Sequence, residues 1–509
     1  MSNYKMNWKT LISRDSQRGR TNVKIVGDLR TPFEKDYHRI LSSASFRRLQ
    51  DKTQVFPLEK NDFIRTRLTH SIEVSSFARS LAQSVSSKII AEKLDYDFGY
   101  EEANHISNIL ASAALLHDIG NPPFGHFGED TIREWFGRNL KEIEIQIPLE
   151  LDEYCKLDES CSNITKKRKL NQILTKQMCE DLEMFEGNAQ AIRLVSKLHF
   201  FIDENGMNLT YALLNTLIKY PVSSINIDRN SNDIRYKKMG YYFAEQDLFN
   251  NIVESTGTKD KYTGDVYRHP LTFLLEAADD IAYCTADVED GVKKGFINFD
   301  DLLECIKSIK DNNLQNNLRD KLIYFKQVGI ENNYENPEIY GIQRWIVSLQ
   351  AIFLNIVSNS FIKNYDDIMN GKMKTDLFKN TEIEEIVKEL KKLATRKVFN
   401  SKNIIKIEIA ANNILSFFLE NFINAFLYYD TDLEEDKLHS INQKFIDIIS
   451  DNYLHIYKFY SSQYEKIESN KFLVFQYKLY LRLLLVTDYV CGMTDSYAKS
   501  LYQELMGID

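Results

Sequence analysis

Apolar residues recur at helical spacing along most of the chain. The clearest segments are 68–90, 103–117, 271–294 and 404–427, where apolar side chains return every three or four positions. Alternation with a period of two is rare, and 222–227 and 241–244 are the best candidates for short strands. Eight prolines and 19 glycines in 509 residues are few for a turn-rich β fold. We therefore expect an all-α, mainly helical protein with a few short strands.

The polar stretches are typical of inserts and loops on the surface of one domain, and they do not divide the chain into separate domains. Residues 139–181 are rich in charge and irregular, which predicts an inserted helical lobe, and 223–238 is typical of an exposed loop. Lysine and glutamate alternate over 363–396, as on a solvated helix face. No Pro/Gly/Ser-rich linker interrupts the chain, so we expect residues 1–509 to form a single large body.

Composition narrows the function classes. The formal net charge of −9 argues against a protein that coats nucleic acid, although it allows a local basic patch. The six cysteines show no CxxC spacing and are typical of reduced thiols. The polar N-terminus predicts no signal peptide, and the apolar stretch 472–490 carries Lys478, Arg482 and Asp488, which favours a buried helix over a membrane span. We expect a cytoplasmic location.

The sharpest chemical motif is an adjacent His117-Asp118 pair at the end of an apolar helical segment. Gly120 is expected to stop this helix, and Asn121 precedes Pro122, which disfavours further helix. Buried ionisable groups need a partner, and a divalent metal would serve both. Taken alone, His117 would be interpreted as an ordinary core histidine.

Further candidate ligands strengthen the metal hypothesis. Arg67 and His70 are three residues apart and share a helix face, and an arginine beside a histidine ligand suits a phosphate ester. Downstream, Asp279, Tyr283 and Asp287 follow each other at intervals of four on a mostly apolar helix. We interpret Asp280, Glu289 and Asp290 as a solvated acidic face.

Six strings in this order resemble the bacterial dGTP triphosphohydrolases, a family of the HD phosphohydrolase superfamily. They are SFRRLQDKTQVFPLE (45–59), RTRLTHS (65–71), HDIGNPPFGHFGE (117–129), FEGNAQ (185–190), EAADDIAY (276–283) and GMTDSYA (492–498). The mammalian HD-domain dNTPase shares only the sparser pattern. The resemblance runs from about residue 30 to the C-terminus and matches least well in the insert.

The resemblance implies an all-α HD core over about 30–300, with residues 301–509 completing the nucleotide pocket. It implies that Mn²⁺ or Mg²⁺ is held by four ligands: His70, His117, Asp118 and Asp279. Two histidines and two aspartates accept several divalent metals, so the ligand types do not select one.

The family reaction releases a deoxynucleoside and intact triphosphate, so water must attack the α-phosphorus. The resemblance places His126 as the group that protonates the leaving 5′ oxygen and Glu129 as the carboxylate that orients its imidazole. For the triphosphate it implies Arg67, Lys219, Tyr220 and Lys238, and Lys238 is chosen over its neighbour Lys237.

Sugar and base contacts are also implied by the resemblance. Tyr283 would crowd the 2′ position, and Gln54 and Asp287 would bind the 3′-OH. Val55 and Phe399 would enclose the base, Glu408 would accept from the guanine N1–H and 2-amino group, and Asn188 would face the nucleotide. Adenine lacks the N1–H and 2-amino donors, so a buried carboxylate at this position would favour guanine over adenine. The family's usual Gly-Tyr after EIA is Ala411-Asn412 here, which bears on strict guanine selection.

Three alternatives stay open. One is another HD phosphohydrolase acting on other nucleotides, and a second is a regulatory nucleotide sensor with a degenerate site. The third is a role with single-stranded DNA, as activator or substrate, for which the basic run 166–169 is a candidate. The resemblance favours a homo-oligomer such as a hexamer, and expects dGTP or another dNTP as substrate, with single-stranded DNA or a nucleotide as activator.

Overall fold

The fold is helical, as the periodicity predicts. A computed structural model describes residues 4–19, 27–58, 61, 63–148, 151, 165–199 and 203–508. The first half contains α1 (Trp8–Leu11), α2 (Pro32–Ser42), α3 (Ala44–Arg48), α4 (Arg67–Glu92), α5 (Tyr100–Leu116), α6 (Gly125–Asn139), β1 (Glu144–Pro148), β2 (Thr165–Lys169), α7 (Leu170–Ile173), α8 (Lys176–Glu183), α9 (Gly187–Arg193), α10 (Tyr211–Leu217) and α11 (Gln246–Ser255).

The second half contributes helices only, within the described residues. They are α12 (Pro270–Lys293), α13 (Phe299–Lys307), α14 (Asn312–Glu331), α15 (Pro337–Lys363), α16 (Tyr365–Met369), α17 (Glu384–Ala394), α18 (Lys402–Phe426), α19 (Glu434–Lys437), α20 (Ser440–Ile448), α21 (Asp451–Ile467), α22 (Lys471–Gly492) and α23 (Asp495–Met506).

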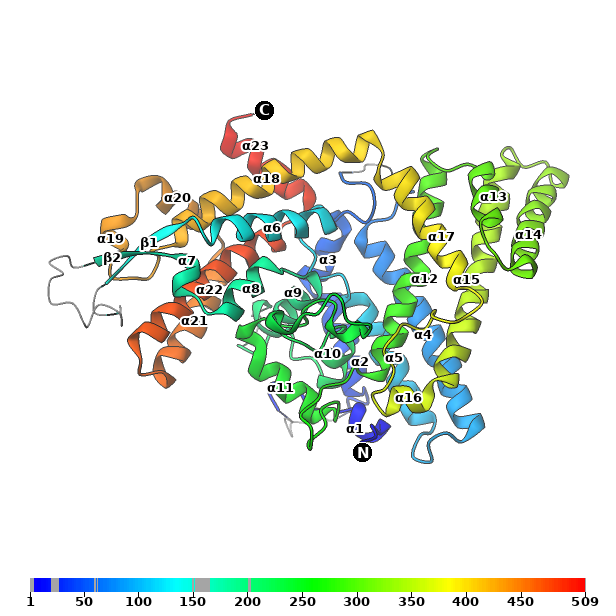
Figure 1. The fold of residues 1–509 in the computed structure, drawn as a ribbon, viewed down its shortest axis with the longest axis horizontal. Coiled ribbons are helices and arrows are strands. Elements are labelled where there is room, and N and C mark those ends of the chain that lie inside the picture. The colour runs from blue at the N-terminus through cyan, green and yellow to red at the C-terminus, as the bar shows by residue number, and fades with distance from the viewer. Residues whose placement is uncertain are drawn as a thin grey trace.

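Two hydrophobic cores organise these helices. One core is built on α4, α5, α10, α12 and α15. The other is built on α6, α8, α18, α20 and α22. Figure 1 shows α4, α5, α12 and α15 of the first set on the right, α10 near the centre, and α8, α20 and α22 of the second set on the left. Because α6 follows α5 directly in sequence, the segment 117–124 carries the chain from one core to the other.

Local signals fix where the helices that carry the site begin and end. Thr66 caps α4, accepting from the Thr69 N–H, and Pro270 opens α12, where its missing N–H removes no helical bond. The helix α5 ends at Leu116, and His117 forms its C-cap. At Gly120 an added Cβ would lie 2.2 Å from the Ala191 nitrogen, so a glycine there lets α9 pack directly on this turn.

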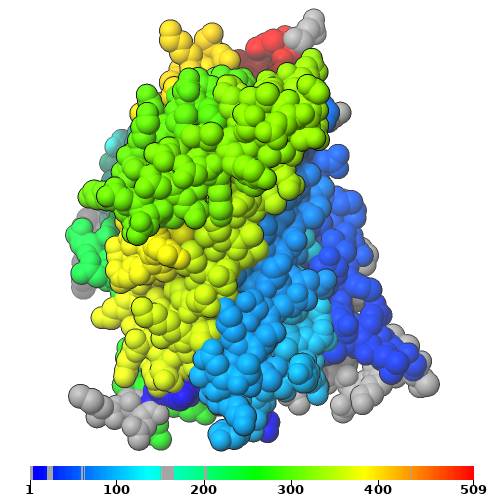
Figure 2. All heavy atoms as spheres, turned by 90° about the vertical axis from the view of Figure 1, so that its right-hand side faces the viewer, coloured from blue at the N-terminus to red at the C-terminus, as the bar shows by residue number. Residues whose placement is uncertain are grey.

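The apolar helix α15 lies on the outer side of the first core. Among the described helices it is the one long and apolar enough to cross a bilayer, by length and composition alone. It packs against α4, α12 and α14, and Figure 2 shows α4 in blue beside α15 in yellow-green. The apolar stretch 472–490 forms most of α22, whose residues 479–491 are all buried, as predicted.

Two sequence expectations are wrong. The segments 222–227 and 241–244 form no strand; the first contains the 3-10 turn Ser224–Asn226, and the second runs into the 3-10 turn Phe243–Glu245. In the second segment the Phe243 N–H donates to Asp181 Oδ2 at 2.7 Å, so it is not available for pairing with a strand. The insert 139–181 is not purely helical, since its basic run belongs to β2, which pairs antiparallel with β1 from Glu144↔Lys169 to Pro148↔Thr165. Residues 149–150 and 152–164 of the insert, with Cys155 and Cys161, lie outside the described residues.

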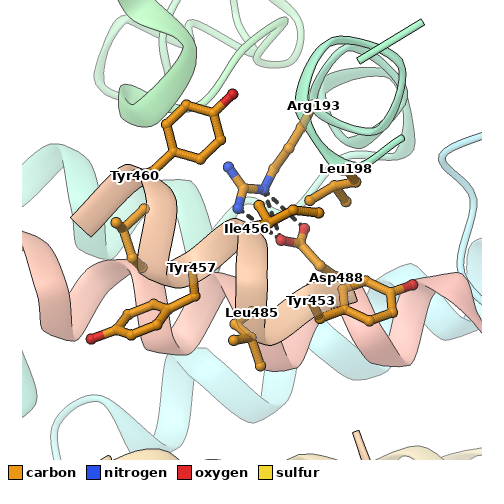
Figure 3. A pocket seen from close by; sticks show the side chains of 9 residues that line it. Arg193, Leu198, Tyr453, Ile456, Tyr457, Tyr460, Leu485 and Asp488 are labelled. Carbon is orange, nitrogen blue, oxygen red and sulfur yellow. Dashed lines mark hydrogen bonds and ion pairs between the residues drawn. The ribbon is translucent and has the colours of Figure 1, made fainter. Parts of the chain in front are cut away.

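A buried ion-pair network ties α9 to α22. The Arg193 guanidinium lies 2.7 Å from Asp488 Oδ2 and 2.8 Å from Glu245 Oε1, and all three residues are almost fully buried. Figure 3 shows Arg193 and Asp488 facing each other beside Tyr453, Tyr457 and Tyr460. The cavity they border measures about 10 Å³, room for about one water. It is a feature of packing and too small for a nucleotide.

We predict that Asp488→Ala destabilises the protein by about 3–5 kcal/mol, because it removes the main partner of a buried guanidinium. Urea unfolding followed by fluorescence measures this loss. The control is Lys388→Ala, which breaks the exposed Lys388–Glu384 pair on α17 and is expected to cost less than about 1 kcal/mol. Equal, small losses in both variants would contradict the structural role of the network.

Candidate functional site

Three helices of the first core bring together a compact set of metal-binding side chains. His70 lies on the first turn of α4, His117 caps α5, and Asp279 lies in α12. One ligand atom from each of these residues lies within 4.8 Å of the others. These residues are up to 209 positions apart in the sequence, and the packing of α4, α5 and α12 brings them together.

The two imidazoles face the same carboxylate. Asp279 Oδ1 lies 3.3 Å from His70 Nε2 and 3.3 Å from His117 Nε2. The other ring nitrogen of His117, Nδ1, lies 2.7 Å from the Ala114 carbonyl oxygen, which can only accept. This contact fixes the proton on Nδ1, so that in the neutral ring the Nε2 lone pair points into the cluster.

Asp118 stands beside this group and links it to Arg67. Its Oδ2 lies 3.4 Å from His117 Nε2 and 2.5 Å from Arg67 Nη1, and its Oδ1 accepts from Asn121 Nδ2 at 2.7 Å. On the opposite side, Lys219 Nζ lies 3.1 Å from Asp279 Oδ2. The cluster is therefore bordered by two cations, Arg67 and Lys219.

The attraction between neighbouring opposite charges outweighs the effect of burial on the pKa values of these groups. Burial opposes charge on His117, but the neighbouring Asp118 and Asp279 outweigh it and raise the pKa of His117 to about 10. Burial also opposes charge on the two aspartates, and their cationic neighbours, Arg67 for Asp118 and Lys219 for Asp279, hold both pKa values well below the usual range. The aspartates are thus ionised and can act as ligands.

The cluster fits a divalent cation. Within the described part of the chain, His117 Nε2 and His70 Nδ1 are buried and make no hydrogen bond. Buried nitrogens that lack a hydrogen bond are costly, and His117 Nε2 has only its longer contacts to Asp118 and Asp279. A metal that binds imidazole would satisfy this nitrogen and both carboxylates together. Imidazole nitrogens with carboxylate oxygens suit Mn²⁺, Fe²⁺, Zn²⁺ and related ions.

A second pair of residues, His126 and Glu129, projects from the start of α6. His126 Nδ1 lies 3.3 Å from Glu129 Oε2; the imidazole is 72% exposed and the carboxylate 3%. The hydrogen bond to Glu129 raises the pKa of His126, and the same bond, against burial, lowers the pKa of Glu129 to about 2. The Glu129 carboxylate thus favours the protonated form of the His126 ring.

The backbone before this pair is strained. Phe124 and Gly125 both have φ of +63°, a conformation that costs a non-glycine residue about 1–2 kcal/mol. At Gly125 an added Cβ would lie 2.7 Å from Arg67 Nη2, so a side chain there would collide with the arginine. The double left-handed turn brings the start of α6 against the start of α4.

Arg133, which the sequence did not single out, supports Glu129 from behind. Its Nη2 lies 3.2 Å from Glu129 Oε2 and 3.1 Å from Glu186 Oε2. Glu186 in turn lies 2.8 Å from Lys238 Nζ and accepts from Asn188 Nδ2 at 2.7 Å. Arg133 therefore joins the His126–Glu129 pair to the lysine and asparagine expected at the nucleotide. Glu129 and Arg133 are four residues apart, a spacing that places oppositely charged side chains side by side on a helix, so the sequence could have predicted this contact.

An open pocket of about 290 Å³ lies over these groups. Seven of the residues expected from the sequence line it: Gln54, Val55, Arg67, His126, Tyr283, Phe399 and Glu408. Phe399 belongs to a π-helical turn, Thr395–Phe399, which continues α17, and such turns are frequent at functional sites. The rings of Tyr283 and Phe399 are nearly parallel, with centroids 6.5 Å apart.

The remaining expected residues lie around the pocket's lining. Asp287 is buried within α12, its oxygens make no hydrogen bond among the described residues, and burial raises its pKa well above the usual value. Tyr220 is nearby, since Lys219, Lys238 and Glu186 all influence its pKa. The structure thus places the predicted set in one neighbourhood and leaves their roles to be tested.

One prediction about α12 is wrong. Asp280, Glu289 and Asp290 do not form a solvated face, because each has a cation from a distant segment. Lys391 Nζ lies 2.7 Å from Asp280 Oδ1, and Arg65 lies 2.5 Å from Glu289 Oε2 and 2.6 Å from Asp290 Oδ1. Asp290 is fully buried. The partners come from α17 and from the segment before α4, which the local pattern of α12 does not reveal.

Comparison with known proteins agrees with this geometry. Residues 67–199 match the HD domain family. A deoxyguanosinetriphosphate triphosphohydrolase-like protein of Listeria innocua is 45% identical, covering 99% of this chain and 100% of the relative. A protein of the same description from Synechocystis is 33% identical over 99% of this chain and all of the relative. A deoxyguanosinetriphosphate triphosphohydrolase of Yersinia pestis is 31% identical over 94% of each chain. The chain therefore belongs to the deoxyguanosinetriphosphate triphosphohydrolase family of HD-domain proteins.

Proposed function

We propose that this protein is a metal-dependent hydrolase that converts dGTP and water to deoxyguanosine and triphosphate. The observation that carries the proposal is the His70, His117 and Asp279 cluster, which has Arg67 and Lys219 on its two sides. Arg67 also lines the open pocket of about 290 Å³ and so connects the cluster to it. A chain of this family with that site has the donors to hold a metal and the charges to hold a triphosphate.

The metal would be held by His70, His117 and Asp279, with Asp118 as the fourth expected ligand. When bound, a divalent ion supplies a positive charge that polarises a phosphate oxygen and lowers the pKa of a coordinated water. Arg67 and Lys219 add fixed positive charge beside the carboxylates. They bind the negatively charged phosphate oxygens, assisted by Tyr220 and Lys238.

His126 supplies the proton that the leaving group needs. As the water oxygen bonds to the α-phosphorus and releases a proton to the solvent, the bond between phosphorus and the 5′ oxygen breaks. The His126 imidazolium donates its proton to that oxygen. The bond from Glu129 supports this role, because it raises the pKa of His126 and so favours the protonated ring. Deoxyguanosine and intact triphosphate are the products.

Side chains at the far end of the pocket select the nucleoside. Tyr283 crowds the 2′ position, while Gln54 and Asp287 bind the 3′-OH. The buried Gln54 Oε1 and both Asp287 oxygens lack hydrogen-bond partners among the described residues, which suits polar groups that meet a substrate hydroxyl. Val55 and Phe399 enclose the base, Glu408 accepts from guanine, and Asn188 faces the nucleotide. The homo-oligomer and the DNA or nucleotide activator stay predictions.

For the metal site, we predict that His70→Ala lowers Mn²⁺ affinity at least tenfold, since even indirect partners of a metal ligand cost about 10–100-fold. Isothermal titration calorimetry measures the affinity, and Mn²⁺ should raise the Tm of the unaltered protein. His126→Ala is the control and should bind Mn²⁺ normally. Unchanged Mn²⁺ binding by His70→Ala would refute this ligand assignment.

For the reaction, we predict that the protein with Mn²⁺ converts dGTP to deoxyguanosine and triphosphate and leaves GTP intact. Ion-pair chromatography of reactions with the four dNTPs and GTP resolves the products. Cleavage of all four dNTPs would keep the mechanism and remove the role of Glu408 in guanine selection. Diphosphate or monophosphate products, or no turnover even with single-stranded DNA added, would overturn the proposed function.

For the proton donor, we predict that Glu129→Gln lowers kcat and moves the alkaline limb of the kcat–pH profile to lower pH. Loss of the carboxylate lowers the pKa of His126 toward its ordinary value, so the acid form is lost at a lower pH. The control is Asp130→Asn, which alters the neighbouring exposed carboxylate that also contacts Arg133. An alkaline limb that does not move in Glu129→Gln would exclude His126 as the donor held by Glu129.

A further inference from the structure

The GMTDSYA string has no part in the pocket's lining, yet its aspartate lies beside the site. Asp495 is the first residue of α23 and is 2% exposed. Its carboxylate contacts two segments that are far away in sequence, around Thr53 and around Phe124. These segments carry residues of the proposed reaction.

Each oxygen of Asp495 holds one segment. Oδ2 accepts from the Thr53 backbone N–H at 3.1 Å and from the Thr53 hydroxyl. Oδ1 accepts from the Phe124 backbone N–H at 3.0 Å. The carboxylate is thus a bridge between two loops that make no regular secondary structure with each other.

The two segments carry different parts of the pocket. Thr53 precedes Gln54 and Val55, which line the nucleoside end. Phe124 is the left-handed residue that precedes Gly125 and His126 at the start of α6. A shift of either backbone would therefore move a substrate-binding side chain or the proton donor.

Lys52 reinforces the same junction. Its Nζ, which is buried, donates to the Asn121 carbonyl at 2.6 Å and to the Cys491 carbonyl at 2.7 Å. Its own carbonyl accepts from the Arg67 N–H at 3.2 Å. The end of α22, the start of α23 and both loops are therefore fixed to one another by buried polar contacts, which are costly to leave unmade.

We propose that Asp495 is a positioning residue that couples the nucleoside-binding loop to the loop that presents His126. This inference rests on the proposed function for its kinetic consequences. Its structural content is that one carboxylate sets the position of both loops together. The C-terminal corner between α22 and α23 thereby controls catalysis without touching substrate.

The test is Asp495→Asn in the full-length protein. The asparagine has the shape of aspartate, but its NH₂ group must face either the Thr53 N–H or the Phe124 N–H, whichever way the amide is turned. Ser496→Ala is the matched control, because Ser496 is the next residue of α23 and donates to Asp51 Oδ1 at 2.8 Å, at the end of the turn that precedes the segment 53–56. Hydrogen exchange by mass spectrometry and steady-state kinetics are measured for both variants.

We expect Asp495→Asn to speed exchange in 53–56 and 121–128 together and to leave α10 unchanged. We expect kcat for dGTP to fall at least tenfold. The preference for dGTP over 2′,3′-dideoxy-GTP should also fall, because Gln54 is no longer held at the 3′-OH. Ser496→Ala should stay within twofold of the unaltered protein in every measurement. A purely structural role would lower the Tm without changing the sugar preference.

Faster exchange in one loop alone would overturn the proposal that Asp495 couples the two loops. Faster exchange in both loops with unchanged kcat and unchanged sugar preference would also overturn it. If Asp495→Asn does not fold, Thr53→Val removes one of the three bonds and should loosen both segments to a smaller degree; no change in either would overturn the proposal. If the unaltered protein cleaves no dNTP, the proposed function fails, and the exchange pattern alone decides the inference.

Discussion

The whole site depends on burying ionised aspartates and histidines at one point between helices. Asp118 and Asp279 are ionised because Arg67, Lys219 and the imidazoles lie against them. Removing such charges from water is expensive, and each group here is tolerated because of its neighbours. The helices α4, α5 and α12 must therefore pack in one register, since sliding any of them would leave a buried charge alone. This requirement makes the first core a rigid support for a metal.

The second core carries the residues that are proposed to protonate the leaving group and to contact the base. His126 and Glu129 come from α6, and Glu408 comes from α18, both of which pack in the second core. The pocket lies where the cores meet, because Val55 and Ile404 belong to the first and Phe124 and Ala411 to the second. The proposed proton donor, His126, and the proposed base-selecting carboxylate, Glu408, can then be positioned independently of the proposed metal ligands. The junction also explains why contacts such as Lys52 to Cys491 and Asp495 to Phe124 are needed.

Sequence reasoning succeeded where one helix or one motif carries the information. The spacing of Asp279 and Tyr283 on an apolar helix, and the His117-Asp118 pair before Gly120, both reflect local geometry. It failed where a distant partner decides the outcome. Asp290 was interpreted as solvated because its partner, Arg65, is 225 residues away. The strand β2 was missed because a run of lysines and arginine shows no apolar alternation, and β1 alone provides its pairing.

The proposed base selection depends on one face of the helix α18. The helix α18 presents Ile404, Ile407, Glu408 and Ala411 to the pocket, an apolar face with one carboxylate. Partial burial already raises the pKa of Glu408. A carboxylate discriminates strongly only when the base has excluded water from it, because exposed groups find solvent partners instead. Ala411 is buried and lines the pocket beside Glu408, so its methyl group takes up space on this face of α18. The proposed selection of guanine therefore depends on how closely a base can approach α18, as well as on the carboxylate itself.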